Sequence, residues 1–171
     1  MPERGGNTPI GGVSGVAKEP SGFIRESFRQ SGLFYEVKCL DIRTQKVLPR
    51  LSKYYAADPA LSRAVLGGKK PDAGAVLENV IYLELIRRGF DVFAGRLGEY
   101  ETGFAAQRPD ETLYVWAAVS VRTPEVLQRA LKSLKAVGDS CRKFILTLDN
   151  DPAADFDGIV RMNALEWLMG R

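Results

Sequence analysis

The stretch from Gly74 to Val121 places one apolar helix directly before three short strands, and this order restricts the fold more than any other feature of the chain. The segment GAVLENVIYLELIRRGF predicts a helix that begins after Asp72 and ends near Arg88, with Gly89 at its C-terminal cap. Apolar residues surround most of the helix, so we expect it to pack on a sheet and on other helices. The segments DVFAGRL, EYETGFAAQ and TLYVWAAVSV then predict three strands.

The residues after these strands predict a crossover to a further strand. Thr123 and Pro124 are typical of the start of a helix, and the apolar residues that follow are spaced to form one face. RKFILTL is a short continuous apolar run, as expected of a strand buried inside a sheet. Because a helix joins it to TLYVWAAVSV, we expect the two strands to be parallel neighbours. A strand near 159–162 and a closing helix over 164–169 complete the predicted α/β core.

The composition indicates one ordinary globular domain and excludes several kinds of site. The chain has 171 residues, of which 45% are hydrophobic and 26% charged, and its net charge of +3 does not by itself indicate a nucleic-acid-binding protein. It contains no histidine, which excludes Ser-His-Asp and Cys-His catalysis and histidine-ligated zinc. No apolar run is long enough to span a membrane. Cys39 and Cys141 match no metal-binding spacing, so we expect a reducing, cytoplasmic location.

The sequence shows no phosphate-binding loop of the kind that holds ATP. The run Gly67-Gly68-Lys69-Lys70 has a superficial likeness to one. It follows a predicted helix over about 58–66, however, rather than a buried strand, and is interpreted as a helix stop followed by a solvated turn.

The N-terminal third predicts three different segments. Residues 1–20 are rich in Gly, Pro and Ser and are expected to be a disordered leader. Residues 21–52 are expected to form a short helix and a β-hairpin, in which LFYEVKCLDI turns at Arg43-Thr44-Gln45. We expect this helix and hairpin to be an appendage outside the core formed by residues 53–171.

Four segments together resemble a known family. They are GLFYEVKCLDIRTQKVL, SKYYAADPALSRAVLG, AGAVLENVIYLELIRRGFDVFAGRLG and KFILTLDNDPAADFDGIVRMNALEWL. In order and spacing they resemble the C-terminal domain, of unknown function, of bacterial and archaeal AAA-type ATP-binding proteins. That domain is similar to PD-(D/E)XK nucleases. The resemblance implies a restriction-endonuclease-like mixed sheet flanked by helices, with residues 21–52 as a winged-helix remnant. It also implies a piece or remnant of a longer ATPase, whose ATPase domain could act in trans.

The resemblance identifies four positions of a degenerate nuclease site. Glu78 matches the helix glutamate that would help to bind metal; the alternatives are a glutamate that pairs with an arginine or faces water. Gly103 stands where the family has an aspartate for Mg²⁺. Trp116 and Ala118 stand in place of a carboxylate and a lysine, and Trp116 is interpreted as core rather than as a base-stacking residue. Without metal ligands and the lysine, neither catalysis nor metal binding is expected.

The expected function is that of a catalytically inactive accessory module that contacts DNA or protein. Two other functions remain open. One is a residual Mg²⁺-dependent nuclease that uses Glu78, Glu101 and either Glu99 or Asp91. Glu101 lies two residues before Gly103, about 6.6 Å along a strand, which argues against it as a substitute ligand. The other is a scaffold or dimerisation domain, since the sequence leaves the oligomeric state open. Candidate DNA contacts, or merely solvated cations, are Arg25, Arg29, Lys38, Arg43, Lys46 and Arg50.

Overall fold

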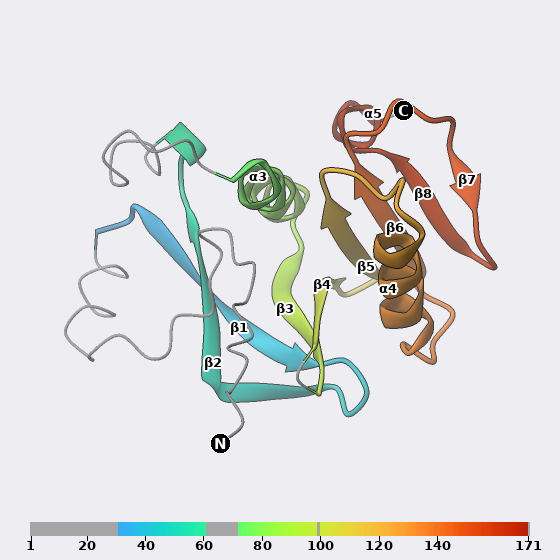
Figure 1. Cartoon of the computed structure of the whole chain (residues 1–171). Coiled ribbons are helices and arrows are strands. Elements are labelled where there is room, and N and C mark those ends of the chain that lie inside the picture. The colour runs from blue at the N-terminus through green and yellow to red at the C-terminus, as the bar shows by residue number, and fades with distance from the viewer. Residues whose placement is uncertain (1–30, 61–71, 99, 171) are drawn as a thin grey trace, which may run out of the picture.

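The computed structural model describes residues 31–60, 72–98 and 100–170, and their strands form an eight-stranded sheet (Figure 1). In chain order the described elements are β1 (Phe34–Asp41), β2 (Lys46–Ala56), α3 (Ala73–Arg87), β3 (Asp91–Leu97), β4 (Tyr100–Arg108), β5 (Glu111–Ala118), α4 (Pro124–Lys135), β6 (Arg142–Thr147), β7 (Ala154–Asp155), β8 (Ile159–Asn163) and α5 (Ala164–Leu168).

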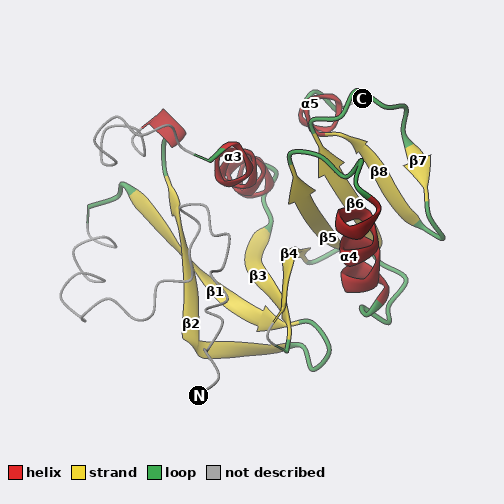
Figure 2. Cartoon of the chain, in the orientation of Figure 1, coloured by secondary structure: helices red, strands yellow, loops and turns green. Residues whose placement is uncertain are grey.

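The sheet is mixed. Its strand order is β2-β1-β3-β4-β5-β6-β8-β7. The pairs β1/β3, β5/β6 and β6/β8 are parallel, and the other neighbouring pairs are antiparallel. Figure 2 shows more strand than helix in the described fold, with α3 and α4 as its longer helices. The chain therefore has a mixed α/β fold, as the sequence predicts.

The two faces of the sheet carry two separate apolar cores. Buried residues of α3 and α5, such as Ile81 and Trp167, pack on one face against Phe104 and Val115. Leu134 of α4 belongs to the core on the other face, with Tyr114 and Trp116 of β5. Alternate residues of β5 thus enter different cores, as expected of a strand that is covered on both sides.

The ends of α3 follow from identifiable capping residues. The Asp72 carboxylate accepts a hydrogen bond from the backbone N–H of Gly74, which satisfies one of the free donors of the first turn. The chain leaves the helix through Gly89, whose φ of +82° favours glycine. Leu77, Ile81 and Leu85 are buried and face the sheet. The predicted helix is therefore confirmed at both ends.

The structure confirms the predicted arrangement of the central strands. The segments expected near 90–96, 100–107, 112–121 and 142–148 are β3, β4, β5 and β6, in one sheet. β5 and β6 are parallel neighbours, with Val115 opposite Phe144. The late strand and closing helix are β8 and α5. Thr123 is the N-cap of α4, although its side chain makes no capping hydrogen bond.

The expectation that the hairpin lies outside the core is wrong. β1 pairs with β3 in parallel, and Val37, Cys39 and Tyr55 of the hairpin are buried in the core beneath α3. The expected boundary between residues 52 and 53 falls inside β2, which runs without interruption from Lys46 to Ala56. The hairpin is therefore part of the same sheet and not an appendage. Residues of α3 cover the apolar face that the appendage would have left exposed.

Several predicted segments lie outside the described residues. They are the leader over 1–20, the helix over 22–30 with Arg25 and Arg29, the run Gly67-Gly68-Lys69-Lys70, and most of the helix over 58–66. At the start of that last helix, the Asp58 carboxylate accepts a hydrogen bond from the backbone N–H of Ala60, as expected of an N-cap. Within the described ranges, no helix has the length and apolar character required to cross a membrane.

Candidate functional site

A lysine is buried between two glutamates at the position where the sequence places the remnant of a metal site. Lys53 on β2 is 3% exposed. Its Nζ lies 2.8 Å from Oε1 of Glu78 on α3 and 2.9 Å from Oε2 of Glu101 on β4. The Tyr55 hydroxyl donates a 2.7 Å hydrogen bond to the same Oε1 of Glu78. These four residues are called the Lys53 cluster below.

The cluster bears on two expectations drawn from the sequence. Glu78 does not simply face open water, since its carboxylate contacts Lys53 and Tyr55 and is 18% exposed. Glu101 was expected to lie too far along its strand to replace the ligand missing at position 103. The carboxylates of Glu78 and Glu101 nevertheless reach the same ammonium, because Lys53 extends toward them from β2, across the intervening β1 and β3.

The backbone of β2 and a cluster of aromatic rings hold Glu78 and Tyr55 in place. The side-chain amide of Asn79, next to Glu78, donates to the Ala56 carbonyl and accepts from the Ala56 N–H, both at 2.9 Å. This pair of bonds fixes the first half of α3 against the end of β2. The Tyr55 ring stacks on Tyr82 with 4.4 Å between centroids and contacts Phe104 at 5.5 Å. The tyrosine hydroxyl is therefore directed at Glu78 by packing.

The electrostatics of the cluster favour a charged lysine. Burial by itself would lower the pKa of the Lys53 amine, but the charges of Glu78 and Glu101 and their hydrogen bonds outweigh it and hold the pKa above its usual 10.5. Burial, followed by the charge of Glu78, raises the pKa of Tyr55 well above its usual value. Lys53 is therefore a cation and Tyr55 a neutral donor across the physiological pH range.

The residues of this site do not fit Mg²⁺. The ion requires oxygen ligands in near-octahedral geometry at about 2.0–2.1 Å. One oxygen each of Glu78 and Glu101 already contacts the Lys53 ammonium, which supplies the positive charge between them. Across residues 31–60, 72–98 and 100–170, no three His, Cys, Asp or Glu side chains are grouped so that they could hold a metal ion.

The backbone conformation at position 103 requires a glycine. The absence of a carboxylate there therefore has a structural cause. Its φ is +87°, in the region that favours glycine, beside a β-bulge between β3 and β4. A Cβ at this position would overlap the Val115 carbonyl oxygen and lie 2.9 Å from the Trp116 Cα. The backbone of β4 therefore leaves no space for an aspartate at position 103.

Trp116 and Ala118 lie on the face of the sheet opposite to α3. Trp116 is 6% exposed and packs in the core beneath α4, with the Arg129 guanidinium 5.7 Å from its ring. Ala118 packs against the same core. The interpretation of Trp116 as a core residue is confirmed, and neither position shares a face of the sheet with the Lys53 cluster.

The remaining candidates lie apart from the cluster. Asp91 is exposed at the start of β3, five residues and roughly 16 Å along the strand from Arg96, which pairs with Glu101. Glu99 lies outside the described residues. Of the candidate DNA contacts, Lys38 pairs with Glu36 at 2.7 Å. Three others, Arg43, Lys46 and Arg50, are exposed around the hairpin turn.

Lys53 and Tyr55 are the residues that the sequence reasoning missed. Both residues lie in the segment SKYYAADPALSRAVLG, to which the resemblance assigns no site residue. The sequence did contain a signal for Lys53. Residues two apart in a strand share a face, and the aromatic ring of Tyr55 indicates that the face it shares with Lys53 is buried. A lysine on that face needs a carboxylate partner, since an unpaired buried charge is strongly unfavourable.

Stability should fall steeply above about pH 10. Burial raises the pKa of Tyr55 and Tyr82 and raises that of Tyr114 to about 12, while Glu78 and Glu101 raise that of Lys53 despite its burial. Each folded-state pKa lies above its unfolded value, so the fold favours the protonated form. This stabilisation is complete below the unfolded values near 10 and is lost as the pH rises through the folded ones.

Urea unfolding at increasing pH measures this loss, and tyrosinate absorbance measures the ionisation of the rings. We expect Tyr55, Tyr82 and Tyr114 to ionise mainly together with unfolding, and Tyr55→Phe to make the pH dependence of stability shallower. Complete ionisation of the tyrosines in a folded protein near pH 10 would show that the hydroxyls are not held as described.

Comparison with known proteins identifies one similar chain. An "Uncharacterized protein" of Haemophilus influenzae strain Rd is 34% identical over 137 residues, which cover 80% of this chain and 34% of that relative. The chain thus spans about a third of the length of the curated relative it matches. No family model matches the chain. No solved structure matches it either.

Proposed function

We propose that this chain is a nuclease-like module that does not cut nucleic acid and that serves an AAA-type ATPase as an accessory domain. The observation that carries the proposal is the buried Lys53 ammonium between Glu78 and Glu101. A cation-dependent nuclease would use this space for its metal ion. Here the Lys53 ammonium supplies the positive charge. Unlike a metal ion, an ammonium group has no open coordination position at which a water molecule could be activated.

The arrangement of elements supports the nuclease-like part of the proposal. α3 precedes the antiparallel strands β3, β4 and β5, and α4 then leads to the parallel strand β6. A helix with an early glutamate before three such strands is the layout expected of the PD-(D/E)XK core. The restriction-endonuclease-like assignment rests on this order and on the sequence resemblance.

The proposed partners are an ATPase domain and DNA. The Haemophilus relative extends well beyond the matched region, which covers 34% of it. The rest of that relative is long enough to hold a further domain. We propose that an ATPase domain of this kind acts together with this chain, in cis or in trans. For DNA, the proposed contact is the hairpin turn, where Arg43, Lys46 and Arg50 are exposed. Binding through such cations would weaken as the salt concentration rises.

A cleavage assay tests the absence of nuclease activity. Plasmid and single-stranded DNA are incubated with Mg²⁺ or Mn²⁺ and with wild type or Glu78→Ala. We expect no cleavage above the buffer control for either protein, because the Lys53 ammonium occupies the position between the two carboxylates. Cleavage by wild type that is lost in Glu78→Ala would contradict the proposal.

The same assay tests the second candidate function, a residual metal-dependent nuclease. The convergence of Glu78 and Glu101 favours this candidate more than the sequence alone did. Such an enzyme would have to move Lys53 out of the site before a metal ion could enter. Cleavage that also disappears in Glu101→Gln would establish it.

A further inference from the structure

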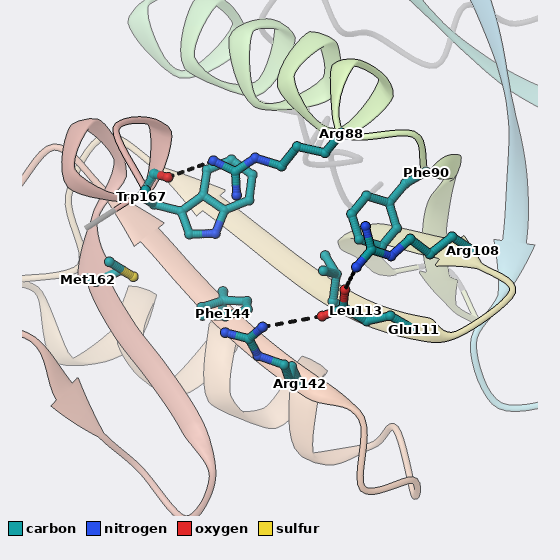
Figure 3. A pocket seen from close by; sticks show the side chains of 10 residues that line it. Arg88, Phe90, Arg108, Glu111, Leu113, Arg142, Phe144, Met162 and Trp167 are labelled. Atoms are coloured by element: carbon teal, nitrogen blue, oxygen red, sulfur yellow. Dashed lines mark hydrogen bonds and ion pairs between the residues drawn. The ribbon is translucent and has the colours of Figure 1, made fainter.

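A pocket lined by arginines lies over β5 and β6, beside α5 and the residues that follow α3, apart from the Lys53 cluster. It has a volume of about 450 Å³, within the range of roughly 300–1,000 Å³ that is usual for small-molecule sites. Arg88, Arg108 and Arg142 line it, and Glu111 is the one carboxylate among its lining residues. Figure 3 shows Arg108 and Arg142 directed toward Glu111, with Arg88 across the pocket over Trp167.

Each arginine is held over an aromatic ring of the core. The guanidinium carbon of Arg88 lies 4.0 Å from the centroid of Trp167. The same distance is 4.7 Å for Arg108 over Phe90 and 5.1 Å for Arg142 over Phe144. Contacts of this kind are favourable and fix the plane of the guanidinium. The arginines are therefore oriented before any ligand binds, which lowers the entropic cost of binding.

The guanidinium groups keep donors that can serve a ligand. Nη1 of Arg142 lies 3.3 Å from Glu111, which leaves Nε and Nη2 without a hydrogen-bond partner in the described part of the chain. Arg108 contacts Asp110 through Nε and Glu111 through Nη2. Arg88 donates to Glu84 and to the Trp167 carbonyl. Glu84, Asp110 and Glu111 share the charges of these arginines, and Arg142 keeps the most donors for a ligand.

We propose that this pocket binds the phosphate group of a nucleotide, either free or at an exposed position of a single strand. A phosphate has enough acceptor oxygens to bridge two guanidinium groups, and the arginine fork matches its geometry. Leu113 and Met162 provide an apolar wall against which the base can lie. Glu111 holds Arg108 and Arg142 in the free protein, and the phosphate replaces it as their partner.

The proposal is tested by calorimetric titration of the full chain with AMP, with adenosine, and with a short single-stranded oligothymidylate. Arg142→Gln removes the most exposed guanidinium of the pocket, whose side chain is 68% exposed, so the fold should persist. Arg122→Gln is the matched control, since Arg122 is 63% exposed, is paired with Asp151 and does not line the pocket. Glu111→Gln removes the competing carboxylate.

We expect AMP to bind, adenosine to bind at least tenfold more weakly, and Arg142→Gln to raise the Kd for AMP by about tenfold. Arg122→Gln should change it less than about twofold, and Glu111→Gln should lower it. Tighter binding of the oligonucleotide than of AMP, with the same sensitivity to Arg142→Gln, identifies a strand as the ligand; the reverse order identifies a free nucleotide. Equal binding of adenosine and AMP, equal effects of the two arginine variants, or no binding overturns the proposal.

Discussion

Replacing Lys53 with methionine is expected to lower the free energy of unfolding by about 3 kcal/mol. The substitution leaves Glu78 and Glu101 facing each other without the ammonium that both contact. Removing one partner of a buried ion pair costs about 3–5 kcal/mol, and the lower end applies here because Glu101 is 45% exposed. Urea unfolding of both proteins at neutral pH measures the difference.

Lys38→Met provides the matched control for this prediction. Lys38 lies on the neighbouring strand and also contacts a glutamate, Glu36, at 2.7 Å, but its side chain is 44% exposed. Exposed pairs contribute up to about 1 kcal/mol, so the control should lose far less stability. Equal losses in the two variants would mean that burial of Lys53 between two carboxylates has no special role.

Gly103→Asp should destabilise the fold by about 3 kcal/mol or more and should not create a metal site. The substitution restores the carboxylate that the family resemblance places there. However, the position has a φ of +87°, and the new Cβ would overlap the Val115 carbonyl oxygen. The left-handed conformation costs about 1–2 kcal/mol, and overpacking in a filled interior adds about 1–3 kcal/mol.

Gly98→Asp separates the two causes. Gly98 also has a positive φ, +59°, but a Cβ there would meet no atom within 4 Å. The free energy of unfolding of this variant should therefore fall by only about 1 kcal/mol, the cost of the left-handed backbone conformation. Thermal unfolding of both variants gives the comparison. A Gly103→Asp protein as stable as Gly98→Asp would show that β4 can move away from β5, and that position 103 can accept a ligand after all.

The local elements could be predicted because their signals lie within short segments. The apolar residues of α3 recur along the whole helix, and Asp72 and Gly89 mark its two ends. Parallel pairing of β5 with β6 followed from the helix that joins them and from the apolar character of RKFILTL. In each case the decisive residues are neighbours in sequence or are joined by one connection.

The position of the hairpin could not be predicted in this way. β1 joins the sheet through three residue pairs with β3, Cys39–Ala94, Leu40–Gly95 and Asp41–Arg96. These partners lie more than fifty residues apart, and a short parallel pairing of this kind leaves no periodic pattern in either segment. The resemblance to a winged-helix remnant favoured an appendage, whereas burial of Val37 and Tyr55 under α3 decided the actual fold.

The candidate site was predicted only in part. The resemblance identified Glu78, and the structure places it at the centre of a polar cluster. The cation that neutralises Glu78 is the Lys53 ammonium. It could not be found from the helix-and-strand motif that contains Glu78, because Lys53 lies on a strand that precedes this motif. For Gly103, the sequence shows a missing carboxylate but not the conformation that excludes one, since a positive φ depends on how β4 fits its neighbouring strands.

The most direct test of the central claim is the anomalous diffraction of crystals soaked in Mn²⁺. The claim is that the Lys53 ammonium takes the place of a metal ion between Glu78 and Glu101. We predict no anomalous peak between these carboxylates in the wild-type protein and a peak there in Lys53→Ala, which removes the ammonium and opens the space that it fills. A manganese peak between Glu78 and Glu101 in the wild-type crystals, with Lys53 displaced, would contradict the account.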